Sequence, residues 1–383
     1  MKVTAAVLRR SDGPYELEEV ELDPPAVGEL LVRIVGAGMC HTDAVPRAAG
    51  GFSPPPIITG HEGAGVVEMV GEGVRDVSIG DHVVLSFDSC GECVNCHGSR
   101  PAYCDTFLAR NLLGRRLDGT TGARDQAGRE ISSRWFGQSS FATHCVVSER
   151  AAVVVDRNLP LEILGPLGCG ILTGAGSVMV AMNVRGGSSI VVFGAGAVGL
   201  AAVMAANVVG AAPIIAVDLH PHRLALATEL GATHVVEGPS SDVVAQVQAI
   251  TGGGADFSFD TTGNVSVIVN AVAALRMTGH CGLAGIQTEK LTLDPVALLG
   301  KTVSGILEGG ADPRVLIPRL IALWRQDRFP FDRLIETFPL KAINVAEEAS
   351  ASGRVVKPVL IPPAGPRGSN TSQSSFFSRS RRL

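Results

Sequence analysis

Residues 188–199 read SSIVVFGAGAVG, and this stretch decides the fold of the chain. An apolar run leads into a G-x-G-x-x-G turn, and the Ala-rich segment after it predicts a helix. The first glycine allows a tight turn, the second lets backbone approach a pyrophosphate, and the third lets the helix pack against the strand. The helix start adds free N–H groups. Asp218 ends the next apolar run, as the full fingerprint requires. The dinucleotide site is therefore predicted at Gly194, Gly196, Ala197, Val198, Gly199 and Asp218.

The sequence around this motif alternates apolar runs with Ala-rich helical segments such as HRLALATELG. Such alternation predicts right-handed crossovers and a doubly wound parallel sheet. The uncharged stretch between Arg185 and Asp218 is long enough for a membrane span, but it contains glycine turns, Asn207 and Pro213. An apolar strand covered on both faces explains it better. Five buried strands are expected: SSIVVFGAG, APIIAVD, THVVEG, ADFSFDTTG and GHCGLAG.

The cofactor region is placed at 171–307. The segments on either side of it have a different pattern of apolar residues. Residues 1–170 hold short Val/Ile strands broken by Gly and Pro, typical of an irregular β-rich domain. Residues 308–362 have the same pattern as residues 1–170 and are expected to pack on that first domain. Residues 363–383 are rich in Ser and Arg without apolar periodicity, which predicts a disordered tail. The fold class is therefore α/β with two domains.

Composition and charge restrict the functional classes. The 383-residue chain carries a formal net charge of −5, without the basic footprint of a nucleic-acid binder. The N-terminus becomes charged too early for a signal peptide. Eight cysteines without such a signal point to a reducing compartment, where clustered thiols hold metals more often than they form disulfides. We expect a cytoplasmic protein that binds neither membrane nor nucleic acid.

Four of the cysteines lie within residues 90–104, which read CGECVNCHGSRPAYC. The C-x2-C-x2-C-x7-C spacing fits a compact, fully ligated zinc lobe over about 88–106. An iron–sulfur site is the weaker interpretation, because the bacterial ferredoxin run has a shorter last gap and a proline where this chain has Asp105. A zinc-ribbon module for nucleic acid would need a basic surface. A closed site leaves no position for substrate, so the lobe is expected to be structural. Its ligands would be Cys90, Cys93, Cys96 and Cys104.

Three more segments complete a pattern: GMCHTD at 38–43, GHEGAG at 60–65 and GPLGCGILTGAG at 165–176. Together with the dinucleotide motif they resemble the zinc-dependent medium-chain alcohol dehydrogenases, from residue 1 to about 360. The segment FGQSSFATH and the length of the loop before it are most similar to the aryl (benzyl) alcohol dehydrogenase branch. The resemblance implies a GroES-like catalytic domain joined to a Rossmann cofactor domain.

The resemblance also implies a second, catalytic zinc. Alcohol dehydrogenases use two cysteines and one histidine as ligands, and this set is carried over from the family. The zinc would lower the pKa of the bound alcohol, and the resulting alkoxide would pass hydride to the nicotinamide. In this family Thr42 would take the alcohol's proton, Asp43 would fix the tautomer of the histidine ligand, and Glu62 would be a nearby acid. The implied zinc ligands are Cys40, His61 and Cys169.

Further family positions concern the cofactor and the substrate. Asp218 without a positive residue directly after it favours NAD over NADP, although Arg223 is one helical turn further on. Trp135 and Phe136 would line the substrate pocket, or they would simply plug the interdomain cleft. The remaining cofactor contacts implied by the resemblance are His41 and Lys357 for the pyrophosphate, Thr173 for the nicotinamide and Arg223 for the ribose.

One departure is Val45, which stands where liver-type enzymes carry a relay histidine, so the resemblance gives no proton route beyond Thr42. The expected reaction is the interconversion of a primary, aryl or allylic, alcohol and its aldehyde, by hydride transfer from a zinc-bound alkoxide. The alternatives are thiol-dependent formaldehyde oxidation and a catalytically idle zinc-binding protein, against which the intact ligand set argues. A homodimer or homotetramer is expected through the strand around 300–307, since an uncovered sheet edge invites pairing.

Overall fold

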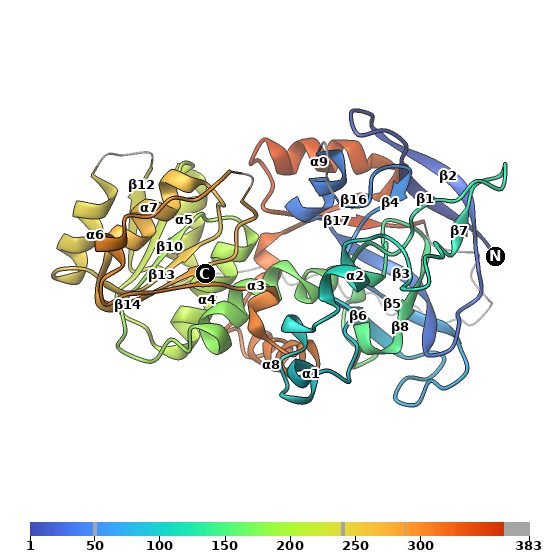
Figure 1. The fold of residues 1–383 in the computed structure, drawn as a ribbon, viewed down its shortest axis with the longest axis horizontal. Helices are drawn as coiled ribbons and strands as arrows, with labels where there is room; N and C mark the ends of the chain where they lie inside the picture. Colours follow the sequence, from blue (N-terminus) through green and yellow to red (C-terminus); the bar gives the residue numbers. More distant parts are fainter. Residues whose placement is uncertain (49–51, 239–241, 288, 364–383) are drawn as a thin grey trace, which may run out of the picture.

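The computed structural model describes residues 1–48, 52–238, 242–287 and 289–363. Two lobes lie side by side along the long axis, and the helix α3 (Gly170–Gly176) lies between them (Figure 1). The cofactor half forms one lobe, and the blue N-terminal half forms the other together with the red C-terminal strands. Of the predicted tail, 364–383 lies outside the described residues. Within the described ranges, no helix combines the length and the apolar composition that a bilayer span needs.

The cofactor half is built on a six-stranded parallel sheet in the order β12-β11-β10-β13-β14-β15. The central strand β10 carries the apolar run found in the sequence, and all four of its residues are buried. One expectation was wrong: β12 is an edge strand and only Val236 in it is buried, because no neighbouring strand covers its outer side. The strands are β10 Ile190–Phe193, β11 Ile214–Asp218, β12 His234–Glu237, β13 Ala255–Asp260, β14 Leu275–Leu283 and β15 Thr302–Gly305. The helices are α4 Ala197–Val209, α5 Pro221–Glu229, α6 Val243–Thr251 and α7 Val265–Ala273.

The other half consists of two largely antiparallel sheets. One has the order β4-β1-β2-β7, and the other has the order β16-β17-β3-β5-β6-β9 with β8 beside β3. The strands are β1 Lys2–Leu8, β2 Tyr15–Leu22, β3 Glu29–Gly38, β4 Ile57–Ile58, β5 Glu62–Val70, β6 His82–Leu85, β7 Ala123–Arg124, β8 His144–Ser148, β9 Ala152–Val155, β16 Ile335–Pro339 and β17 Lys357–Ile361. The remaining helices are α1 Val94–His97, α2 Phe107–Asn111, α8 Pro313–Trp324 and α9 Ile343–Ala351.

Two features bring distant parts of the chain to one place. Strand β17 pairs antiparallel with β3, and β3 pairs with β5, so the C-terminal segment returns to the N-terminal half. Helix α3 packs directly on α4, because Gly174 has no side chain: a Cβ there would lie 2.1 Å from the carbonyl oxygen of Val198. The segment that carries Cys169 and Thr173 is thereby held next to the glycine-rich turn.

Candidate active site

Cys40, His61 and Cys169 form a cluster whose ligand atoms all lie within 4.8 Å of one another. Cys40 precedes the short helix His41–Arg47, His61 directly precedes β5, and Cys169 directly precedes α3. The Nε2 atom of His61 is buried and has no hydrogen-bond partner among the described residues. An orphaned buried nitrogen costs free energy unless something binds it. Two thiols and one imidazole are ligands that suit zinc, so the three residues fit the metal that the sequence predicted.

Asp43 fixes the orientation of this histidine. Its Oδ1 accepts hydrogen bonds from His61 Nδ1 at 2.8 Å and from the backbone N–H of Gly60 at 2.9 Å, and its Oδ2 accepts from the backbone N–H of Cys40 at 3.0 Å. Burial lowers the pKa of His61, but Asp43 and Cys40 together outweigh burial and the pKa is raised overall. A proton held at Nδ1 leaves the Nε2 lone pair for the cluster, which is how carboxylate–histidine pairs support metals.

The two thiols of the cluster interact with each other and differ in acidity. The contact with Cys169 lowers the pKa of Cys40, and the same contact and burial raise the pKa of Cys169. Metal binding requires deprotonated thiols. The hydroxyl of Thr42 lies 3.7 Å from Cys40 Sγ, on the same short helix as the exposed His41. Both positions therefore lie beside the cluster, whereas Val45 is partly buried and packs on the hydrophobic core.

Glu62 and Lys357 form a buried ion pair next to the cluster. Lys357 Nζ lies 2.9 Å from both carboxylate oxygens of Glu62 and 2.9 Å from the carbonyl oxygen of Met39. Burial raises the pKa of Glu62 despite the ammonium beside it. Lys357 is 2% exposed and its ammonium is fully engaged. The structure thus gives Lys357 a carboxylate partner where the sequence predicted a pyrophosphate contact, and that contact stays a prediction.

The two predicted pocket residues differ in their surroundings. The ring of Phe136 stacks on His61, with 4.4 Å between centroids and 24° between planes. Trp135 packs edge-on against Phe136 at 5.5 Å, is 0% exposed, and its Nε1 has no partner among the described residues. Trp135 therefore offers no surface to a substrate in this structure, because its ring lies wholly inside the core. This fits the alternative that the residue only fills the cleft between the domains. Phe136 lies directly beside the metal cluster.

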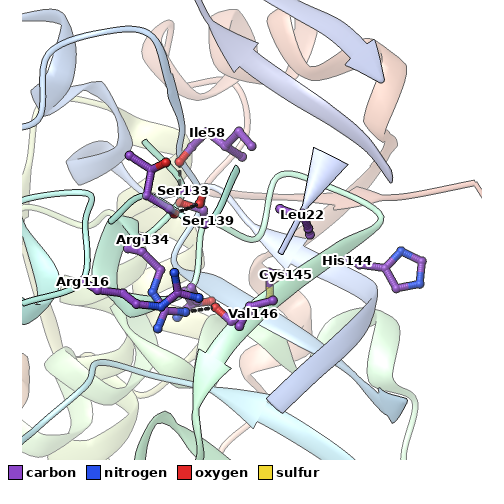
Figure 2. Close-up of a pocket in the computed structure, with 12 residues that line it drawn as sticks. Leu22, Ile58, Arg116, Ser133, Arg134, Ser139, His144, Cys145 and Val146 are labelled. Atoms are coloured by element: carbon purple, nitrogen blue, oxygen red, sulfur yellow. Dashed lines mark hydrogen bonds between the residues drawn. The ribbon is translucent and has the colours of Figure 1, made fainter. Parts of the chain in front are cut away.

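The loop that carries both rings is anchored on both sides. Gln138 donates to the carbonyl oxygens of His61 at 3.0 Å and Ser86 at 3.2 Å, and accepts from the N–H of Gly63. Figure 2 shows the other side of the loop, where Arg134 donates to the carbonyl oxygen of Val146 beside a small cavity. Arg134 also pairs with Glu29, which Arg116 contacts from the other side. These contacts fix Phe136, which has a φ of +48°, against the histidine ring.

The four cysteines of the lobe also meet. Their Sγ atoms lie within 4.8 Å of one another, and all four are free of disulfides. Backbone N–H groups of Glu92 and Cys93 donate to Cys90 Sγ at 3.4 and 3.3 Å, and the N–H of Cys90 donates to Cys104 Sγ at 3.2 Å. Such amide donors stabilise thiolates, so the lobe fits a second metal ion.

The glycine-rich turn has the geometry that its sequence implies. Gly194 has a φ of +93°, and a Cβ at Gly199 would lie 1.7 Å from the carbonyl oxygen of Gly194. A Cβ at Gly196 would meet nothing within 4 Å, which leaves open space at the start of α4. Asp218 accepts from the N–H groups of Ala195 at 2.6 Å and of His220 at 2.9 Å. The turn and the carboxylate thus lie at one edge of the sheet, the edge where dinucleotides bind.

The guanidinium of Arg223 donates to the carbonyl oxygen of Gly353 at 3.3 Å, and its predicted ribose contact stays a prediction. Sequence reasoning also missed two residues of the site. Gln138 stood inside a quoted motif, but nothing in its spacing indicated that it braces His61. Glu308 is buried beside Cys169 and Thr173, and its only sequence signal is an isolated charge in the apolar, glycine-rich segment GILEGGA.

A largely buried Cys–His–Cys cluster next to a glycine-rich nucleotide turn defines a zinc-dependent dehydrogenase. Comparison with known proteins gives the same class. Residues 26–157 match the alcohol dehydrogenase GroES-like domain, and residues 197–322 match the zinc-binding dehydrogenase domain. A geraniol dehydrogenase from Castellaniella defragrans is 46% identical over 93% of this chain and 97% of its own length.

Solved structures agree with these matches. A benzyl alcohol dehydrogenase from Acinetobacter calcoaceticus has 40% identity and a TM-score of 0.91, over 94% of this chain and 99% of that one. A zinc-binding alcohol dehydrogenase domain protein from Burkholderia ambifaria has 47% identity and a TM-score of 0.92, over 95% and 100%. The chain belongs to the zinc-dependent alcohol dehydrogenase family. The predicted family, the GroES-like and Rossmann fold, and an alcohol dehydrogenase activity are thereby confirmed.

Proposed function

We propose that the enzyme interconverts a primary allylic or aryl alcohol and its aldehyde, with NAD as the hydride carrier and two zinc ions per chain. The orphaned Nε2 of His61, directed at two thiols, is the observation that supports a catalytic metal most strongly. The aromatic ring of Phe136 beside that histidine supports a flat, unsaturated substrate, because aromatic groups attract one another beyond their buried area. Relatives named for geraniol and for benzyl alcohol fit the same substrate class.

The positions of the residues support the following roles. Cys40, His61 and Cys169 would hold the zinc, which as a Lewis acid makes the alcohol easier to deprotonate while NAD takes the hydride. Thr42, beside Cys40, is the hydroxyl in position to accept the proton of the alcohol. Asp43 keeps the histidine in its metal-binding tautomer. Glu62, held by Lys357 and by the N–H of Gly170, adds negative charge near the cluster without joining it.

The substrate class can be tested with a panel of alcohols and a change at Phe136. We expect the unmodified enzyme to prefer benzyl and allylic alcohols to ethanol, measured as kcat/KM with NAD. Phe136→Ala should lower kcat/KM for benzyl alcohol by about twofold to tenfold more than for ethanol, since an aromatic pair is worth about 0.5–1.5 kcal/mol. Phe136→Leu is the matched control, because it keeps the bulk of the side chain but removes the aromatic ring. It should lose most of the same preference for benzyl alcohol.

An equal loss for both alcohols would contradict a substrate contact at Phe136. Trp135→Ala should instead lower stability and affect all alcohols alike, as expected for a residue that is 0% exposed. The same panel distinguishes the proposed alcohol oxidation from the main alternative, thiol-dependent formaldehyde oxidation. Turnover of formaldehyde only when glutathione is present, without benzyl alcohol oxidation, would favour that alternative.

The choice of NAD is supported by Asp218. Its carboxylate lies at the nucleotide edge, where it can accept hydrogen bonds from ribose hydroxyls and would repel a 2′-phosphate. Arg223, the nearest candidate to compensate, contacts Gly353 instead. We expect Asp218→Ser to lower kcat/KM for NAD by about tenfold to a hundredfold, the cost of a lost hydrogen bond to a charged group. The ratio of kcat/KM with NADP to kcat/KM with NAD should rise. A wild-type enzyme that uses both cofactors equally would contradict the role of Asp218.

A homodimer, or a tetramer built from dimers, is supported by the edge of the cofactor sheet. Strand β15 is the last strand of that sheet, and the neighbouring apolar side chains Met277, Val296 and Leu299 are 64–71% exposed. An open strand edge with apolar neighbours favours pairing with a second copy. Light scattering should give at least twice the chain mass of 39.6 kDa. A mass of one chain at micromolar concentration would contradict this prediction.

A further inference from the structure

Gln138 is a fully buried amide that makes three hydrogen bonds beside the metal cluster. It is 0% exposed. Its Nε2 donates to the carbonyl oxygens of His61 at 3.0 Å and Ser86 at 3.2 Å, and its Oε1 accepts from the N–H of Gly63 at 3.0 Å. Carbonyl groups only accept and a backbone N–H only donates, so this arrangement needs both ends of a carboxamide. One side chain thereby joins the start of β5 to the residue that follows β6.

A second link leads from Ser86 to the other side of the cluster. The Ser86 hydroxyl donates to the carbonyl oxygen of Gly168 at 2.6 Å, and Gly168 is the residue before Cys169. Gly168 can approach this closely because it has no side chain: a Cβ there would overlap with the carbonyl oxygen of Leu85. Ser86 is 1% exposed. It is therefore joined on one side to Gln138 and on the other to the segment that carries Cys169.

These two side chains connect metal ligands that come from separate segments. His61 directly precedes β5 and Cys169 directly precedes α3, yet their ligand atoms lie within 4.8 Å of each other. The path between them runs from the His61 carbonyl through the amide of Gln138 and then through Ser86 to Gly168. Every member of this path is buried, and leaving any of its polar groups unpaired would cost free energy. The path therefore restrains the distance between the two segments.

The backbone on both sides of Gln138 is held in an unusual conformation. Phe136 has a φ of +48° and Ser139 has a φ of +54°, in the left-handed region that non-glycine residues avoid. The hydroxyl of Ser139 ties this loop to the carbonyl oxygen of Ile58, close in sequence to the histidine ligand. Such conformations persist where the surrounding structure holds them, and they cluster at functional sites. This strain fits a loop whose side chains must lie in one position.

We propose that Gln138 is a positioning residue for the catalytic metal. Acting with Ser86, it holds the segments of His61 and Cys169 at the separation that the ion requires. This inference rests on the proposed function, since it requires a metal at the cluster. The role differs from that of Asp43, which orients the imidazole ring, because Gln138 fixes the backbone that carries the ring. Removing a group that orients metal ligands lowers metal affinity by about tenfold to a hundredfold.

The test removes the carboxamide and follows the metal itself. Zinc-loaded enzymes are titrated with a chelator of known affinity, and zinc per chain and alcohol oxidation are measured at each step. Gln138→Met keeps the length of the side chain but cannot donate a hydrogen bond. In this variant the zinc whose release abolishes turnover should bind about tenfold to a hundredfold more weakly. The zinc of the four-cysteine lobe should keep its wild-type affinity.

Ser86→Ala is the second variant and removes only the link to Gly168. It should weaken binding of the same zinc by about twofold to tenfold, the effect of one neutral hydrogen bond. It also carries the test alone if Gln138→Met does not fold.

Asn111→Leu is the matched control. Asn111 is also a 0% exposed amide: its Nδ2 donates to the carbonyl oxygens of Asp88 and Phe107, and its Oδ1 accepts from the N–H of Asp88. None of these partners belongs to the Cys–His–Cys cluster. The control should lower thermal stability about as much as Gln138→Met, yet leave the zinc needed for turnover at wild-type affinity.

Three results would overturn the proposal. They are wild-type affinity for that zinc in the Gln138 or Ser86 variant, a parallel weakening of both zinc ions, and an equal weakening in the Asn111 control. The last two would reduce the role of Gln138 to general stability. Failure of the proposed function would appear separately, as wild-type enzyme that holds no zinc outside the four-cysteine lobe or oxidises no alcohol.

Discussion

Cys169→Ser is expected to abolish alcohol oxidation while leaving cofactor binding intact. The substitution removes one of two thiols from the buried cluster and leaves Cys40 and His61 without a third strong ligand. Lewis-acid assistance is worth several kcal/mol and each 1.36 kcal/mol is a factor of ten, so kcat/KM should fall by about a thousandfold or more. The glycine-rich turn and Asp218 are not altered, so NADH should still bind. The measurements are alcohol kinetics, NADH fluorescence titration and zinc content.

The control for this substitution is Cys281→Ser. Cys281 is also a buried thiol, but it lies in β14 within the cofactor sheet and belongs to neither cysteine cluster. The Cys281→Ser enzyme should retain the zinc content and most of the activity. If Cys169→Ser kept both zinc ions and normal turnover, the assignment of the catalytic metal to this cluster would be wrong.

Cys96→Ser is expected to damage stability rather than chemistry. A structural zinc contributes folding free energy directly, and breaking its four-thiolate site forfeits part of it, about 3 kcal/mol or more. The midpoint of thermal unfolding should fall by about 5–10 °C, and inactivation at elevated temperature should speed up. At low temperature the folded fraction should keep its kcat to within a few-fold, since the four cysteines of the lobe belong to a different cluster from Cys40, His61 and Cys169. Zinc should drop from two ions per chain to one.

Val94→Ala is the matched control within the lobe, because Val94 is 74% exposed and offers no ligand. It should change neither zinc content nor thermal stability. A Cys96→Ser protein that was stable but inactive would mean that the catalytic and structural sites are reversed. One zinc ion in the unmodified enzyme, or iron with visible absorbance, would contradict the two-site proposal.

Much of the fold could be predicted because its signals are local. The G-x-G-x-x-G turn requires particular backbone angles within six residues, and the positive φ of Gly194 and the close approach of Gly199 match that requirement. The exposure of β12 could not be predicted, because an edge strand and a central strand can have the same apolar sequence. The strand order decides between them, and it depends on pairing across the whole domain.

The two sets of metal ligands also differ in how far local sequence could predict them. Four cysteines within fifteen residues can meet without help from the rest of the chain, so their spacing alone indicated a zinc lobe. Cys40, His61 and Cys169 are spread over three segments, and only a family resemblance could group them. The structure supplies the physical reason: β3 and β5 pair at Gly38 and Glu62, and α3 packs on α4 through Gly174.

The sequence by itself therefore determined the fold and the family, and it predicted the nucleotide turn and the zinc lobe from local spacing. Only the tertiary structure decided the partners of isolated charges. Lys357 meets Glu62, 295 positions away, because β17 is inserted beside β3. Glu308 reaches Cys169, 139 positions away, because two glycines let its loop pass close to α3. Contacts over such distances depend on how sheets pair and helices cross, which no spacing within a local motif encodes.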